Sequence, residues 1–227
     1  MAIIKKCKSI VEKIENPLSD VYIVSFRSKE RNYRYLPGQF LHLALDPYDP
    51  SSQWPESRCF SMQTSDNEEL IKITYSVKGV FTRRMASELC VGKEIWLKLP
   101  YGELFNKEHN KNKTVFIAGG TGITPYLSLF SSEQFKEYQN PVLYLGIRDE
   151  NYNLYQMELK NALIVNNSFK VNVINQEIDG ILNIEKILEE NGADKTFFIS
   201  GPPLMIKNFK KILQINKVYD IITDDWE

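Results

Sequence analysis

The stretch Gly119-Gly120-Thr121-Gly122-Ile123-Thr124-Pro125 directly follows the apolar run at residues 114–118. The apolar run predicts a buried strand, and the glycines after it predict a tight turn into a helix that has Thr124 as N-cap and Pro125 in its first turn. Glycines let a ligand approach the backbone, and a helix start offers unpaired N–H groups and partial positive charge, so a dinucleotide pyrophosphate fits this turn. A plain strand-to-helix connector explains these residues equally well, because the spacing differs from G-x-G-x-x-G.

The composition is that of an ordinary globular protein: 227 residues, 43% hydrophobic and 25% charged, with a net charge of −1. This balance argues against a nucleic-acid binder, and no stretch approaches the roughly 20 apolar residues of a membrane span. The N-terminus lacks the apolar core of a signal peptide, so a cytoplasmic location is expected. Three widely spaced cysteines and two histidines predict neither a metal site nor a His-based triad.

The two halves of the chain differ in pattern. The first half predicts a six-stranded antiparallel β-barrel with one short helix at 80–89 and turns at signals such as Asn16-Pro17. The second half alternates strands and helices, which predicts a five-stranded parallel sheet in an α/β domain. The polar run 106–113 separates them, so we expect domains at residues 1–110 and 111–227. The expected strands are 3–12, 20–28, 39–46, 58–62, 70–77, 94–99, 114–118, 142–147, 169–174, 196–200 and 218–222, and the later helices are 125–138, 154–164, 183–191 and 203–215.

A second informative segment is Arg58-Cys59-Phe60-Ser61. Side chains alternate along a strand, so Arg58 and Phe60 share one face. A guanidinium binds phosphate, an aromatic ring stacks on a planar heterocycle, and Ser61 offers a hydroxyl to a ring nitrogen. Taken alone, the four residues are better explained as an ordinary strand with one exposed Arg and one core Phe.

The order of six segments resembles the ferredoxin–NADP reductase family of flavoprotein reductases over essentially the whole chain. Each segment is a weak to moderate match, and together they make a strong one. The segments are Pro37-Gly38-Gln39-Phe40, Arg58-Cys59-Phe60-Ser61, Val77-Lys78-Gly79-Val80-Phe81-Thr82, Tyr101-Gly102-Glu103-Leu104-Phe105, Gly119 to Pro125, and Ser200-Gly201-Pro202-Pro203-Leu204-Met205.

The resemblance implies an N-terminal flavin domain and a C-terminal nicotinamide nucleotide domain. Arg58 would pair with flavin phosphate, Phe60 would pack on the isoalloxazine ring beside Cys59, and Ser61 would lie near flavin N5. Phosphate would also be held by Lys78, Gly79 and Thr82. The nicotinamide site would be formed by Gly120, Thr121, Gly122, Ser200, Gly201, Pro202 and Met205, with Ser61, Thr121 and Ser200 nearest the chemistry.

Ser200 departs from the family pattern, and the C-terminal residues can be compared with it. Ser200 stands where relatives commonly carry Cys, which implies slower turnover rather than none. The pair Asp225-Trp226 aligns with a C-terminal acidic–aromatic pair whose aromatic covers the flavin, but a solvated tail is an equal alternative.

The charged residues that follow two predicted strands, 142–147 and 169–174, bear on the choice between NADH and NADPH. A lone Arg148 is followed by acidic residues at 149 and 150, and Asn175-Gln176-Glu177 follows the next strand. These acidic groups disfavour an extra 2′-phosphate, so NADH is expected over NADPH, with Arg148 at the nucleotide or as a surface charge.

The resemblance implies hydride transfer from nicotinamide to bound FAD, with FMN possible, and electron delivery to a separate acceptor such as a ferredoxin or an oxygenase component. A reductase of free FMN, FAD or riboflavin is the first alternative. A non-catalytic nucleotide-binding regulatory subunit is the second. No nucleic acid, membrane or metal partner is expected.

Overall fold

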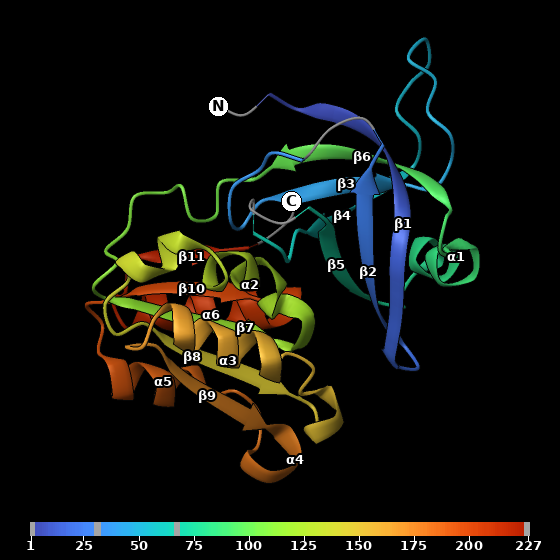
Figure 1. Ribbon diagram of the computed structural model, residues 1–227. Helices are drawn as coiled ribbons and strands as arrows, with labels where there is room; N and C mark the ends of the chain where they lie inside the picture. The colour runs from blue at the N-terminus through green and yellow to red at the C-terminus, as the bar shows by residue number, and fades with distance from the viewer. Residues whose placement is uncertain (1–2, 30–32, 66–68, 225–227) are drawn as a thin grey trace. The chain divides into compact units, whose positions relative to one another are not determined.

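The computed structural model describes residues 3–29, 33–65 and 69–224. The chain packs into two compact units, one formed by Met1–Glu103 with Thr124–Ser128 and the other by Leu104–Ile123 with Leu129–Glu227 (Figure 1). Among the helices of the described residues, none is long and apolar enough to cross a membrane.

The N-terminal unit contains a six-stranded antiparallel sheet in the order β4-β3-β6-β1-β2-β5, which confirms the predicted N-terminal fold. Its elements are β1 (Lys5–Leu18), β2 (Val21–Ser28), β3 (Phe40–Ala44), β4 (Ser57–Ser61), β5 (Ile71–Ser76), α1 (Val80–Glu88) and β6 (Glu94–Tyr101).

The sheet curls so that its two edge strands approach each other. Just after β4, the Gln63 backbone N–H donates to the Lys72 carbonyl of β5 at 2.8 Å. The Gln63 side chain accepts from the Thr74 hydroxyl at 2.7 Å. These bonds satisfy edge groups that an open sheet would expose, and the result is a near-barrel around a core that includes Leu41, Leu43 and Ile73.

The turn predicted at Asn16-Pro17 was wrong, because β1 continues through both residues to Leu18. The register shifts between Glu15 and Leu18, and such an irregularity tolerates a residue without a backbone N–H. The Asn16 amide donates to the Val21 carbonyl at 2.8 Å across the hairpin, and the turn itself lies at residues 19–20, three positions later than predicted.

The C-terminal unit contains a five-stranded parallel sheet in the order β11-β10-β7-β8-β9, also as predicted (Figure 1). The strands are β7 (Thr114–Gly119), β8 (Val142–Ile147), β9 (Lys170–Asn175), β10 (Thr196–Ser200) and β11 (Ile221–Thr223). The helices in this half of the sequence are η1 (Gly120–Ile123), α2 (Thr124–Phe130), η2 (Glu133–Glu137), η3 (Glu150–Tyr152), α3 (Gln156–Val165), α4 (Gln176–Asp179), α5 (Ile184–Asn191) and α6 (Pro203–Ile215). The Thr124–Ser128 part of α2 is counted with the N-terminal unit.

Alternate residues of the central strand β7 supply the two faces of this sheet. Val115 and Ile117 belong to a core cluster with Ile187 of α5 and Phe209 of α6. Phe116 instead meets aromatic rings on the opposite face, namely Phe105, Phe130, Tyr138 and Phe198. Burial of both faces explains why these strands are continuously apolar.

Two predicted ranges in this unit were wrong in part. The helix predicted at 125–138 ends at Phe130, and a separate 3-10 helix, η2, follows it. Ser132 between them adopts an extended backbone, and its hydroxyl donates to the Leu129 carbonyl at 2.8 Å, which caps the first helix. The last strand is Ile221–Thr223 rather than 218–222, because Val218 is buried in the core before the strand begins.

The predicted linker is anchored to the C-terminal unit. The Phe105 ring lies 5.3 Å from that of Phe198, and the His109 ring packs edge-on against the same side chain at 5.0 Å. His109 Nε2 also lies 2.6 Å from the Tyr138 hydroxyl. The polar run at 106–113 is therefore a packed connection, which its composition alone did not indicate.

Candidate functional site

The first group of predicted site residues lies on β4 and at the start of α1, within the N-terminal unit. The exposed fraction of the Arg58 side chain is 53%, and its guanidinium lies over the Phe81 ring of α1 at 5.2 Å. Phe60 is half-buried against the core, with its ring 6.1 Å from that of Tyr75. The structure thus places a cation and an aromatic on one side of β4, as the alternation predicted.

Cys59 points to the other side of the strand. Its Sγ lies 3.6 Å from Nε2 of His42 on the neighbouring strand β3. Burial raises the pKa of the Cys59 thiol and lowers the pKa of His42, with nearby Lys98 lowering the latter further. The two groups therefore face each other as a neutral thiol and a neutral imidazole at pH 7, without the thiolate that a nucleophile requires.

The turn before α1 is closed by the hydroxyl of Thr82. The N–H groups of Lys78 and Gly79 donate to the Thr82 hydroxyl at 2.9 and 3.0 Å. A Cβ at Gly79 would meet no protein atom within 4 Å, so space is open in front of the helix N-terminus. An anionic phosphate suits the space in front of this helix, because the N–H groups of a helix's first turn, the helix dipole and the nearby Arg58 guanidinium all favour negative charge. The residues present fit the phosphate group of a flavin.

The second group lies at the carboxyl ends of β7 and β10, which are neighbours in the C-terminal sheet. A Cβ at Gly122 would lie 2.5 Å from Gly201 Cα, and a Cβ at Gly119 would lie 2.9 Å from Pro202 Cδ and 3.0 Å from Met205 Sδ. The two predicted nicotinamide segments are therefore packed backbone to backbone, and the glycines are what permits it. Gly120, by contrast, has open space where a Cβ would be, so the turn is accessible to a ligand.

Ser200 is buried at the end of β10, with 2% of its surface exposed. Its hydroxyl donates to Asp224 Oδ2 at 3.1 Å, and the Asp224 N–H donates to the Ile199 carbonyl at 3.0 Å. The sequence reasoning overlooked Asp224, because it considered the acidic residue one position later. Asp225 and Trp226 lie outside the described residues.

Arg148 follows β8 and is occupied locally. Its guanidinium lies 4.7 Å over the Tyr152 ring and donates to the Tyr152 hydroxyl at 2.9 Å. At the end of the adjacent strand β9, the Asp179 carboxylate accepts from the Asn175 N–H at 2.9 Å. At this edge of the sheet, Arg148 already contacts Tyr152, and the strand beside it ends near the Asp179 carboxylate.

Comparison with known proteins agrees with this arrangement. Residues 116–211 match the family model described as an oxidoreductase NAD-binding domain. The chain is 24% identical over 210 residues to flavohemoprotein A of Dictyostelium discoideum, covering 84% of this chain and 53% of that one. It is 32% identical over 153 residues to the reductase component of propane 2-monooxygenase from Mycolicibacterium smegmatis, covering 64% of this chain and 41% of that one.

Solved structures show the same two-domain fold. A ferredoxin NADP+ reductase from Neisseria gonorrhoeae with bound FAD and NADP superimposes with a TM-score of 0.79 at 18% identity, covering 97% of this chain and 98% of that one. The chain therefore has the fold of ferredoxin–NADP reductases, and its C-terminal part matches an oxidoreductase NAD-binding domain. This chain spans about half or less of the length of the curated relatives it matches.

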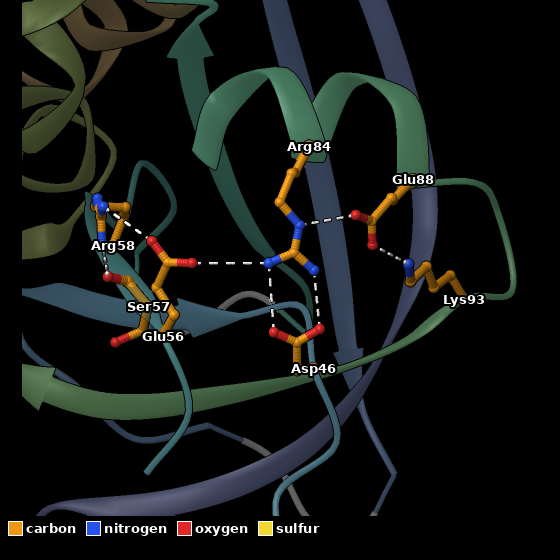
Figure 2. A network of polar contacts seen from close by, with 7 residues as sticks. All are labelled: Asp46, Glu56, Ser57, Arg58, Arg84, Glu88 and Lys93. Carbon is orange, nitrogen blue, oxygen red and sulfur yellow. Dashed lines mark hydrogen bonds and ion pairs between the residues drawn. The ribbon is translucent and has the colours of Figure 1, made fainter. Parts of the chain in front are cut away.

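Other charged groups surround the flavin-side residues, and the sequence reasoning did not single them out. Asp46, Glu56, Arg84, Glu88 and Lys93 form a continuous network that reaches Arg58 (Figure 2). Glu56 lies two residues before Arg58, and this short separation was the one feature of the sequence that could have indicated a contact between them.

Proposed function

We propose that this chain transfers hydride from a nicotinamide nucleotide to bound FAD and passes electrons to a separate acceptor protein. The observation that carries the proposal is the backbone packing of the Gly119–Gly122 turn against Gly201 at the carboxyl edge of the parallel sheet. A nicotinamide nucleotide bound there would have open backbone at Gly120, in the part of an α/β sheet where ligands bind.

The roles proposed for the individual residues come from the resemblance to the flavoprotein reductases. We propose that the flavin phosphate is held by Arg58, Lys78, Gly79 and Thr82, that Phe60 packs on the ring, and that Ser61 donates to it. Because the Cys59 side chain faces His42, Cys59 would contribute through its backbone. A bound flavin supplies a hydride acceptor and onward electron transfer, and the protein supplies orientation and exclusion of water.

On the nicotinamide side, Thr121, Gly122, Gly201, Pro202 and Met205 would shape the ring pocket. Ser200 would lie beside the ring, with its hydroxyl oriented by Asp224. We assign residues 1–110 to the flavin domain and 111–227 to the nucleotide domain. For Trp226, cover of the flavin and a solvated tail stay as equal alternatives.

NADH is the proposed donor. A 2′-phosphate is bound by free cations, whereas Arg148 is already engaged by Tyr152 and its neighbouring strand ends near the Asp179 carboxylate. Steady-state kinetics with both nucleotides test this, and a higher kcat/KM for NADPH would contradict it.

The acceptor proposal is based on the relatives, some of which are described as the reductase components of propane monooxygenase and of a naphthalene dioxygenase system. A ferredoxin or an oxygenase component is therefore the proposed partner of this chain.

One experiment tests the function. The purified protein is examined for a flavin spectrum and titrated with NADH without oxygen. Bleaching of a bound flavin supports the proposal. A colourless protein that oxidises NADH only with added FMN, FAD or riboflavin would instead be a free-flavin reductase. Absence of flavin binding and of NADH oxidation in both settings would reject both and favour a non-catalytic subunit.

A further inference from the structure

Arg58 is paired with Glu56, a carboxylate that directly precedes its strand β4. Its NH2 group donates to Glu56 Oε1 at 3.0 Å, and its NH1 group donates to the Ser57 carbonyl at 2.8 Å (Figure 2). Half of each side chain is exposed, 53% for Arg58 and 49% for Glu56. An exposed pair joined by a single nitrogen is weak and exchangeable.

Glu56 has a second cation on its other side. Its Oε2 lies 3.7 Å from NH1 of Arg84, so the carboxylate sits between two guanidinium groups (Figure 2).

Arg84 is held much more firmly than Arg58. It makes a two-nitrogen contact with Asp46, at 2.8 and 3.3 Å, and its Nε donates to Glu88 at 2.9 Å. Glu88 is held in turn by Lys93 at 3.1 Å. The hydrogen bonds that Arg84 donates to Asp46 and then to Glu88 raise the pKa of Arg84, and they lower the pKa of both carboxyls. Arg84 is thus held in place beside Glu56 by two other carboxylates, whereas Arg58 has Glu56 as its one carboxylate partner among the described residues and can exchange it for another anion.

Three cations and three carboxylates make up this network, so its charges balance before any ligand arrives. An anion that recruits Arg58 must take it from Glu56. We propose that Glu56 is a specificity-determining residue that competes with flavin phosphate for Arg58, and that Arg84 retains Glu56 when Arg58 is released. This inference rests on the proposed function, in which Arg58 binds that phosphate.

The competition acts only on flavins that carry phosphate. FMN and FAD must displace Glu56 from Arg58, whereas riboflavin has no group that makes this exchange. Glu56 therefore lowers the affinity of the protein for FMN and FAD. It reduces the difference between these affinities and the affinity for riboflavin. Because Arg84 keeps Glu56 paired, the exchange leaves no carboxylate without a cation.

The test measures dissociation constants of FMN, FAD and riboflavin by flavin fluorescence quenching, on the flavin-free protein at fixed ionic strength. Glu56→Gln removes the charge and keeps the shape. We expect its FMN and FAD dissociation constants to fall about two- to fivefold, the range of one exposed ion pair, with that of riboflavin unchanged. Arg84→Gln should act in the opposite direction, because Glu56 is then left to Arg58 alone.

Glu12→Gln is the matched control. It removes one carboxylate from an exposed pair in the same unit, where Glu12 accepts from Arg27 Nε at 2.8 Å, without contact to Arg58. It should leave the ratio of FMN to riboflavin affinity at the wild-type value. Thermal unfolding of each variant verifies that it is folded.

Two results would overturn the inference, and they are distinguishable. In the first, the wild type binds flavin, but Glu56→Gln leaves the ratio of FMN affinity to riboflavin affinity unchanged or lowers it. Glu56 then does not compete with the phosphate, and the proposed function stands. If the wild type binds none of the three flavins, the proposed function fails and this role of Glu56 fails with it.

Discussion

At the scale of single residues, the glycines at the ends of β7 and β10 are the most constrained positions of the site. Gly122→Ala would place a Cβ 2.5 Å from Gly201 Cα, where backbone and not a flexible side chain must move. We expect a loss of about 2–3 kcal/mol in the free energy of unfolding, together with weaker NADH binding. Denaturant unfolding and nucleotide titration measure the two effects.

Gly79→Ala is the contrasting variant, since its Cβ would meet no protein atom within 4 Å and its φ of −126° suits any residue. Its unfolding free energy should stay within about 0.5 kcal/mol of the wild type, while flavin phosphate binding weakens. Equal destabilisation by both substitutions would contradict the close-packing argument.

A buried tyrosine offers a second test at this scale. Tyr75 is 3% exposed, and its hydroxyl has no hydrogen-bond partner among the residues that the structure describes. Tyr75→Phe should therefore keep the unfolding free energy or raise it by up to about 1 kcal/mol, because an uncompensated polar group leaves the core.

Tyr33→Phe is its control. The Tyr33 hydroxyl donates to the buried Ser9 hydroxyl at 2.8 Å, so this variant should lose about 1 kcal/mol. The same loss from both tyrosines would show that Tyr75 is satisfied in solution. Urea unfolding at neutral pH makes the comparison.

At the scale of elements, one asparagine holds η2 onto the C-terminal unit. The Asn166 amide donates to the carbonyls of Phe135 and Tyr138, both at 2.8 Å, and its Oδ1 accepts from Ser168. Because Asn166 is buried, Asn166→Ala removes the donor of the Tyr138 carbonyl and one of the two donors of the Phe135 carbonyl, and we expect a loss of about 2–4 kcal/mol.

Asn183→Ala is the matched asparagine substitution. Asn183 is exposed and caps α5 by accepting from the Glu185 and Lys186 N–H groups at 2.9 and 3.1 Å. Loss of a helix N-cap costs about 1 kcal/mol, so the buried asparagine should be clearly the more damaging to remove in thermal unfolding. A reversed order would refute the role assigned to Asn166.

The elements also show what the sequence could predict. The parallel sheet and both glycine segments followed from apolar runs and punctuating glycines, which are local signals. The extension of β1 through Pro17 depended on a register irregularity, and the break after Phe130 depended on a serine that caps the preceding helix. The contacts of Glu56 with Arg84 and of Ser200 with Asp224 join residues 28 and 24 positions apart, which no short motif records.

At the scale of the whole molecule, the carboxylates held by cations or hydrogen bonds are unevenly divided. The pKa is lowered at Asp46, Asp49, Glu88 and Glu94 in the N-terminal unit, and at Asp194 in the C-terminal unit. Hydrogen bonds from Lys29 and then Lys8 lower the pKa of Glu94 to about 2. Burial lowers the pKa of His42, also in the N-terminal unit.

A lowered pKa in the folded state means that folding releases protons from these groups. Their contribution to stability is complete above the pKa of the unfolded carboxyls, about 4.5, and it is lost as the pH falls toward the folded values, to about 2 for Glu94. Protonation of His42 in the unfolded chain acts in the same direction. Acid should therefore unfold the N-terminal unit before the C-terminal unit.

Two spectroscopic signals separate the units. Trp54 and Trp96 lie in the N-terminal unit, and the third tryptophan, Trp226, is replaced by Phe for this measurement, whereas most helices belong to the C-terminal unit. In a titration from pH 6 to pH 2, the tryptophan fluorescence transition should have its midpoint at a higher pH than the loss of helical circular dichroism. Glu94→Gln should make the fluorescence transition less dependent on pH between about 4.5 and 2, because the titrating group is gone. Coincident midpoints would mean that the two units unfold as one and that the uneven distribution of carboxylates does not decide which unit yields first.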